Sequence, residues 1–246
     1  MKKIYILLIT FVTVLILLVT AGFAFETEKT LTLPAEGLKA FRIDCGAGKL
    51  EVIGADGLDR IEVRAAINAD GVSQAKMDEF IKDHVKLSLE KRGDRAVLVA
   101  NIEERWGFFL SGGAWIDLAV RVPKSLALEI DDSSGDMVVE DVAADVVIDD
   151  SSGDIRVARL GGRLDIDDSS GDIDVHDLAG DLAIDDGSGD IEVLKVGGSV
   201  KVDDGSGDIT IDGVGADVLI EDAGSGDVKI DNVKGRVIRH DIDEDD

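Results

Sequence analysis

The stretch Leu164-Asp-Ile-Asp-Asp-Ser-Ser-Gly-Asp-Ile-Asp-Val175 decides the fold. Apolar residues alternate with polar ones on both sides of a Ser-Gly-Asp turn, which predicts two short strands, each with one buried face. Ser-Gly-Asp followed by an apolar residue occurs six times, with glycines at Gly135, Gly153, Gly171, Gly189, Gly207 and Gly226. A step of 18 residues, lengthened by one near Ala223 in the last repeat, is typical of a solenoid whose coils bury their apolar faces against their neighbours.

Alignment of the repeats gives columns of aliphatic residues that we expect to point inward. One of these columns holds Ile148, Ile166, Ile184 and Val202. Parallel strands from successive coils would then stack about 4.8 Å apart. The usual hand of parallel connections favours a right-handed solenoid over a left-handed hexapeptide helix, whose six-residue period is missing here. The sequence therefore predicts an all-β fold, a parallel β-solenoid with 18-residue coils over residues 126–238.

Residues 25–125 are β-rich but irregular, and we expect them to form a cap on the open end of the solenoid. Phe41 to Val52 fits the repeat as a degenerate first coil, which places Cys45 in a column otherwise held by aspartate. Further strands are expected at 61–67 and 116–122.

A short helix and a hairpin are predicted between these strands. The helix covers 73–83, with Ser73 as its N-cap and an apolar face of Met77, Phe80 and Ile81. The hairpin that follows turns at Lys91-Arg-Gly-Asp94, where glycine and aspartate are expected, although the tripeptide Arg-Gly-Asp is also one that integrins recognise.

The amino terminus predicts export. Lys2 and Lys3 precede an uncharged apolar run from Ile4 to Phe25, which ends in small residues and is typical of a signal peptide cleaved after Ala24. A retained membrane anchor at 1–24 is the alternative, since the run is long enough to span a bilayer. In both cases the rest of the chain would lie in the periplasm or at the cell surface, ending in an acidic tail at 239–246.

The formal net charge is -26, and residues 126–234 hold 30 Asp and Glu against 7 Lys and Arg. The acidity thus belongs to the solenoid, which predicts repulsion of nucleic acid and attraction of cations or basic partners. Cys45 is the only cysteine, which excludes an intramolecular disulfide and a cysteine zinc cluster.

Three columns of aspartate run along the repeats, so like charges would repel each other at a spacing of about 4.8 Å. One interpretation is structural, because aspartates accept hydrogen bonds from turn amides. The other is a ladder of calcium ions, which prefer carboxylate and carbonyl oxygens. The candidate calcium ligands are Asp149, Asp150, Asp167, Asp168, Asp185, Asp186, Asp203 and Asp204.

A polysaccharide-cleaving enzyme is the alternative class, since some such enzymes are β-helices that use two carboxylates. Here the carboxylate pairs occur in every coil, whereas a catalytic site would be a local exception. His84, His176 and His240 are scattered, and no nucleophile motif or phosphate-binding loop is present. The sequence therefore predicts no enzyme.

The aromatic segment Trp106–Trp115 is expected to seal one end of the core, with an exposed contact loop as the alternative.

Three motifs together resemble the toast-rack (putative adhesin) domain of bacterial envelope proteins. They are Ile43-Asp-Cys-Gly-Ala-Gly-Lys-Leu-Glu-Val52, Leu118-Ala-Val-Arg-Val-Pro123, and the repeated unit seen in Ser170-Gly-Asp-Ile-Asp-Val175. The resemblance covers about residues 36–238.

This resemblance implies a β-solenoid on the outer side of a membrane, with no assigned enzymatic activity. The expected function is an exported adhesin-like binding or structural protein with an unknown envelope or surface partner, touching the membrane only through an uncleaved 1–24 segment. A component of an envelope-stress sensing system is a further alternative, although the chain lacks the additional membrane segments of such sensors.

Overall fold

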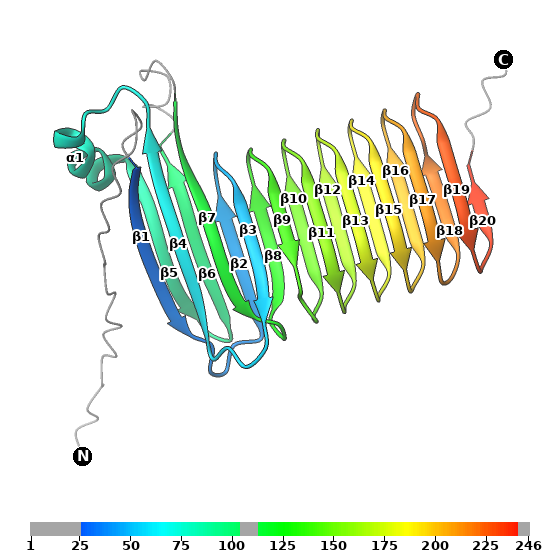
Figure 1. Cartoon of the computed structure of the whole chain (residues 1–246), viewed down its shortest axis with the longest axis horizontal. Helices are drawn as coiled ribbons and strands as arrows, with labels where there is room; N and C mark the ends of the chain where they lie inside the picture. The colour runs from blue at the N-terminus through cyan, green and yellow to red at the C-terminus, as the bar shows by residue number, and fades with distance from the viewer. Residues whose placement is uncertain (1–25, 104–112, 241–246) are drawn as a thin grey trace.

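The computed structural model describes residues 26–103 and 113–240, and in it two long β-sheets face each other along the whole molecule (Figure 1). The predicted export segment and most of the aromatic segment therefore lie outside the described residues. Sheet A has the strand order β1-β4-β7-β3-β9-β11-β13-β15-β17-β19. Sheet B has the order β20-β18-β16-β14-β12-β10-β8-β2-β6-β5.

In the regular part, each coil contributes one strand to each sheet. Sheet B receives β8 (Ala127–Asp132), β10 (Val146–Asp150), β12 (Leu164–Asp168), β14 (Leu182–Asp186), β16 (Val200–Asp204), β18 (Val218–Asp222) and β20 (Val237–Arg239). Sheet A receives β9 (Met137–Glu140), β11 (Ile155–Leu160), β13 (Ile173–Leu178), β15 (Ile191–Val196), β17 (Ile209–Val214) and β19 (Val228–Val233). Successive strands are parallel and pair residues 18 apart, as Ile148 pairs with Ile166. The predicted parallel solenoid is confirmed.

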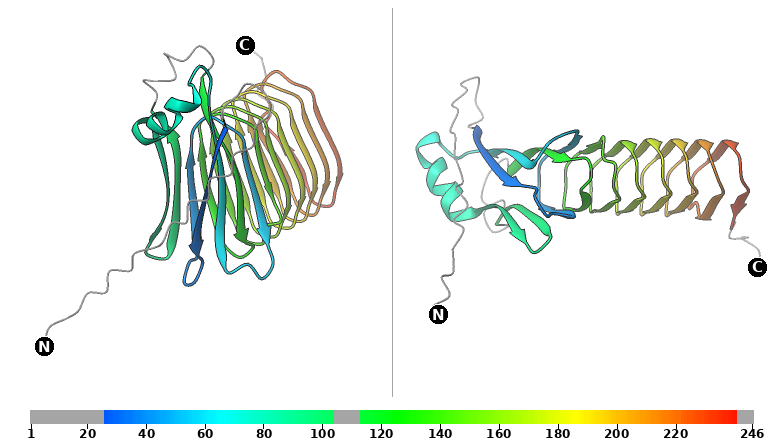
Figure 2. Two further views of the ribbon diagram at one scale, coloured as in Figure 1. Left: turned by 60° about the vertical axis from the view of Figure 1, so that its left-hand side comes forward. Right: turned by 90° about the horizontal axis from the view of Figure 1, so that it is seen from below.

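The core is a narrow aliphatic stack between the two sheets. Ile148, Ile166, Ile184 and Val202 are each no more than 2% exposed and form the predicted inward column. Seen from below, the coils form evenly spaced rungs, and the sheets diverge toward the end where α1 lies (Figure 2). Because the coils are thin, each one buries its apolar side chains mainly against its two neighbours.

The extra residue of the last repeat lies earlier than the sequence suggested. Val202 pairs with Ile220, but Asp203 pairs with Asp222, so Glu221 is the residue that bulges out of the ladder. We expected the insertion near Ala223. The ion pair between Lys201 and Glu221, at 2.8 Å, holds the bulged residue over the neighbouring strand.

The amino-terminal half builds its own coils on the same two sheets. Its strands are β1 (Glu26–Pro34), β2 (Ala40–Cys45), β3 (Leu50–Ala55), β4 (Arg60–Ala69), β5 (Val85–Arg92), β6 (Arg95–Ile102) and β7 (Ala114–Pro123). Strands β2 and β3 stack on β8 and β9, which confirms the degenerate first coil. Strands β6 and β7 pair in parallel with the other edges of β2 and β3, so a later segment of the chain lies outside this first coil.

The end of the molecule is closed by antiparallel strands and a helix. Strand β4 pairs with β1 and β7, and β5 forms the predicted hairpin with β6. The helix α1 (Gln74–His84) buries Met77, Phe80 and Ile81, as its apolar face predicted. Ser73 occupies the N-cap position but makes no side-chain capping bond, which corrects that detail.

The turn glycine of each repeat is required by the distance between coils. Gly189 has φ +153, and a Cβ built on it would lie 1.8 Å from the carbonyl oxygen of Gly171. No side chain fits there, which explains why glycine returns at this position in every coil.

The opposite corner holds a column in the left-handed backbone region that the sequence did not indicate. Non-glycine residues occupy it in most coils, among them Arg159 (φ 56), Asp177 (φ 56) and Lys195 (φ 60). The same column holds Gly213 (φ 82), so glycine fits this corner in the same backbone conformation. Non-glycine residues in this conformation store a small strain.

Replacing Lys195 with glycine is therefore expected to raise the free energy of unfolding by roughly 0.5 to 1 kcal/mol. The control is Lys195→Ala, which removes the same 3.3 Å ion pair with Asp177 but keeps the Cβ. Urea unfolding of both variants measures the difference. A glycine variant no more stable than the alanine variant would contradict a strain larger than the conformational entropy that glycine loses on folding.

Candidate functional site

The two neighbouring aspartate columns point to opposite sides of sheet B. Asp150, Asp168, Asp186 and Asp204 are at most 3% exposed and lie inside the solenoid, together with Asp132; we call these five the inner column. Asp131, Asp149, Asp167, Asp185 and Asp203 lie on the outer surface, and we call them the outer column. Because consecutive residues of a strand face opposite ways, the two members of a pair such as Asp149 and Asp150 cannot bind one cation together.

The inner column secures the turns. Each of its carboxylates uses Oδ1 to accept a hydrogen bond from a backbone amide of the turn that follows. The donors are Ser133 to Asp132 (2.8 Å), Ser152 to Asp150 (3.2 Å), Ser170 to Asp168 (3.1 Å), Ser188 to Asp186 (3.1 Å) and Ser206 to Asp204 (2.9 Å). This is the structural role that turn aspartates were expected to have.

The second oxygen of each inner carboxylate is left without a donor. In all five residues Oδ2 is buried and has no hydrogen-bond partner among the described residues. Burial raises the pKa of Asp132 to about 6, and raises those of Asp150 and Asp186 to about 7, with the neighbouring carboxylates adding to the effect. The pKa values of Asp168 and Asp204 are raised by burial as well. At neutral pH Asp150 and Asp186 are therefore only partly ionised.

Cys45 takes the place of an aspartate at the start of the inner column, as the degenerate first coil predicted. Its strand places Asp44 beside Asp131, and so Cys45 beside Asp132. The thiol is buried, and burial together with the nearby Asp132 raises its pKa, so it stays protonated. A neutral thiol thus ends the row of carboxylates.

A third column links one coil to the next. Its aspartates are Asp136, Asp154, Asp172, Asp190, Asp208 and Asp227. The backbone amide of Asp190 donates to Oδ1 of Asp172 at 2.9 Å, and Asp208 donates to Asp190 in the same way. At the opposite corner Asp181 accepts from the amide of Ser199 at 2.8 Å, a role that the sequence analysis missed. These aspartates serve the architecture.

The outer column is the part of this acidic array that is open to a ligand. Asp149, Asp167 and Asp185 pair in register on adjacent strands and form no ion pair within the described part of the chain. Partial burial and the adjacent carboxylates raise the pKa of Asp167 and of Asp203. Among the described residues, Arg42 pairs with Asp131 at 2.9 Å at one end of the row, and Lys201 pairs with Glu221 at the other.

Calcium binding stays a prediction, and we expect it at the outer column, which faces solvent. Millimolar calcium is then expected to raise the melting temperature more than sodium does at the same ionic strength. A ligand present at a hundred times its Kd adds about 2.7 kcal/mol to the stability. The double variant Asp167→Asn with Asp185→Asn should lose the calcium-specific part. If calcium and sodium act alike in the unchanged protein, the outer column holds no specific calcium sites.

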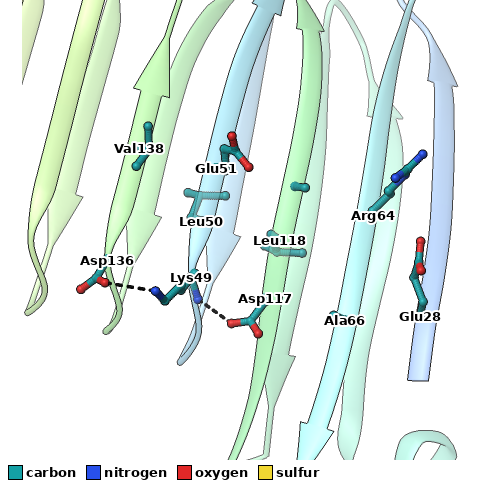
Figure 3. Close-up of a pocket in the computed structure, with 11 residues that line it drawn as sticks. Glu28, Lys49, Leu50, Glu51, Arg64, Ala66, Asp117, Leu118, Asp136 and Val138 are labelled. Carbon is teal, nitrogen blue, oxygen red and sulfur yellow. Dashed lines mark hydrogen bonds and ion pairs between the residues drawn. The ribbon is translucent and has the colours of Figure 1, made fainter. Parts of the chain in front are cut away.

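A shallow groove of about 460 Å³ crosses the outer face of sheet A where the first coil meets β7 and β4 (Figure 3). Small residues such as Ala66 and Ala119 line it, with charged residues around them. The backbone amide of Lys49 donates to Oδ1 of Asp117 at 2.9 Å, and its ammonium lies 3.6 Å from Asp136. The groove was not foreseen, because it depends on the out-of-order packing of β7 beside β3.

Two other sequence features occupy ordinary structural positions. Gly93 (φ 69) and Asp94 form the two-residue turn of the hairpin, and Asp94 pairs with Lys39 at 3.4 Å. Trp115 lies on β7, and its Nε1 donates to Asp117 at 3.2 Å. The rest of the aromatic segment, 104–112, is outside the described residues. Across 26–103 and 113–240, no helix is both long and apolar enough to cross a membrane.

Comparison with known proteins gives a family and several distant structural likenesses. No curated protein matches the chain. A "putative adhesin" from Bacteroides fragilis is 14% identical, with a TM-score of 0.45, and the match covers 87% of this chain and 97% of that one. A "putative lipid binding protein" from Parabacteroides distasonis is 12% identical, with a TM-score of 0.45, over 86% and 94%.

A "putative cell adhesion protein" from Clostridium sporogenes is 12% identical, with a TM-score of 0.36, over 87% and 99%. Likenesses at this level carry no argument about function. The family model Toastrack DUF4097, in contrast, matches residues 16–197, which is most of the chain. The match includes the first coil, strands β4 to β7 and the regular repeats as far as β15. The chain therefore belongs to the Toastrack DUF4097 family.

Proposed function

We propose that the chain is an exported, non-enzymatic protein of the bacterial cell envelope that binds a cationic partner in the manner of an adhesin. The observation that carries this proposal is the outer column. Three aspartates in a row, Asp149, Asp167 and Asp185, are presented on a flat sheet without ion pairs to described residues. Aligned charges of one sign create a field that attracts and orients a partner of the opposite sign.

The regularity of the solenoid supports binding rather than catalysis. The outer aspartates recur at the same place in each coil, whereas a catalytic centre needs differently placed acids and bases with pKa values set apart from one another. The strongly raised pKa values belong to the inner column, which is closed to a substrate. A rigid ladder of equal charges instead suits a long polymer or surface that carries repeated positive groups.

Export is tested by fractionation of the bacterium that encodes the chain, with an antibody against the solenoid. We expect the protein in the periplasmic or surface fraction, together with an envelope marker. Recovery with cytosolic markers would contradict the proposal. Incubation of the purified protein with envelope polysaccharides tests the enzymatic alternative, since release of new reducing ends would reveal a hydrolase.

A further inference from the structure

His176 interrupts the repeat pattern on the outer face of sheet A. Strand β13 places it two residues after Asp174, so both side chains leave the same face of the sheet. Glu192 on the adjacent strand β15 lies in register with Asp174. At the position of His176 the neighbouring coils carry Ala158 and Leu194. An imidazole flanked by two carboxylates is therefore a local exception in an otherwise repetitive surface.

The three side chains converge. One potential ligand atom from each of Asp174, His176 and Glu192 lies within 4.8 Å of the other two. Nε2 of His176 touches Oδ1 of Asp174, yet this oxygen is buried and accepts no hydrogen bond of normal geometry from the described residues. Nε2 carries a hydrogen in one neutral tautomer of histidine and a lone pair in the other. In the second tautomer the nitrogen and the carboxylate oxygen can both serve as metal ligands.

The surroundings leave this position open to a cation. Arg156 approaches the other oxygen of Asp174, with Nη1 3.9 Å from Oδ2, and so leaves Oδ1 directed toward the histidine. Glu192 is exposed and has no ion pair within the described part of the chain. The side chains of His176 and Asp174 are 24% and 29% exposed, so the cluster lies at the outer surface of sheet A.

We propose that Asp174, His176 and Glu192 bind one divalent transition-metal ion of the Zn²⁺ type. Imidazole nitrogen with carboxylate oxygen is a ligand set for such ions, whereas Ca²⁺ and Mg²⁺ prefer oxygen alone. Three protein ligands leave the fourth tetrahedral position to water or to a side chain of a binding partner. The site lies on sheet A and is independent of the outer column on sheet B, so it adds to the proposed function without resting on it.

Calorimetric titration of the metal-free full-length protein with ZnCl₂ tests the site. We expect one saturable equivalent of zinc. The variant His176→Gln keeps a similar side-chain size and should bind about tenfold more weakly or worse, since one of three ligands is lost. The control Asp83→Asn removes an exposed carboxylate of α1 and should leave the zinc affinity within a factor of two. Thermal melting establishes that both variants are folded.

Titration with Co²⁺ provides a second readout that does not depend on affinity. Visible absorption of the bound cobalt reports its coordination, and we expect His176→Gln to change the spectrum while Asp83→Asn preserves it. The proposal is overturned if the unchanged protein binds no saturable equivalent of zinc, or if His176→Gln binds zinc and cobalt as the unchanged protein does. The contact between His176 and Asp174 would then be held by a proton alone.

Discussion

Replacing Ile184 with aspartate is expected to unfold the protein. Ile184 is 2% exposed and lies on β14 between Ile166 and Val202 of the adjacent strands, so the new carboxylate would enter the aliphatic stack with no partner. Burying an unpaired charge costs several kcal/mol, which is comparable to the whole stability of a domain, about 5 to 15 kcal/mol. We expect circular dichroism to show loss of the cooperative melting transition.

The adjacent residue supplies the matched control. Ala183 lies on the same strand but faces outward, with Lys201 beside it on β16. Ala183→Asp therefore adds the same charge to the same strand and should leave the protein folded. A stable, cooperatively melting Ile184→Asp protein would mean that this column faces solvent and that the register of the coils is different.

Raising the pH from about 5 to about 8 is expected to lower the stability by several kcal/mol, because the inner column loses its protons in this range. The folded-state pKa values of Asp132 (about 6), Asp150 (about 7) and Asp186 (about 7) lie above the unfolded value of 3.8. At a pH between the unfolded and the folded-state pKa of an aspartate, the folded chain binds more protons than the unfolded chain. The free energy of unfolding therefore falls as the pH rises through this range. The loss levels off once the pH exceeds the folded-state values, at about pH 8.

Two adjacent substitutions separate the inner column from the general charge of the protein. Asp186→Asn keeps an oxygen that can accept the amide of Ser188 but cannot ionise, so this variant should be more stable than the unchanged protein at pH 8 and less sensitive to pH. Asp185→Asn removes the same charge from the outer surface. It should leave the slope of the free energy of unfolding against pH nearly unchanged. Urea unfolding at several pH values measures both, and equal slopes for the two variants would contradict protonation of the inner column.

The sequence was sufficient for the repeating part of the fold, because each coil repeats the same local pattern. The period of 18 placed the strands, and the alternation placed Ile148 and its column inside. The same alternation also implies that Asp149 and Asp150 face opposite ways. The eight candidate calcium ligands therefore fall into an inner and an outer set, and calcium binding stays a prediction.

Other features depend on contacts that a repeat pattern does not encode. The insertion of β6 and β7 beyond the first coil brings together segments far apart in the chain. Arg159 and Lys195 have left-handed backbone conformations, which glycine adopts most easily. The packing of the neighbouring coils imposes this conformation on them. The carboxylates beside His176 come from two strands, Asp174 from β13 and Glu192 from β15. In the sequence alone His176 is therefore an isolated histidine.

The binding of the purified full-length protein to isolated envelopes of its own bacterium tests the central claim most directly. The triple variant Asp149→Asn, Asp167→Asn and Asp185→Asn removes three outer charges. Its control, Asp78→Asn with Glu79→Gln and Asp83→Asn, removes the same charge from the exposed side of α1. We predict saturable binding that weakens at high salt, is lost in the triple variant and is retained in the control. Undiminished binding of the triple variant would contradict a role for the outer column, and no binding by the unchanged protein would contradict an envelope partner.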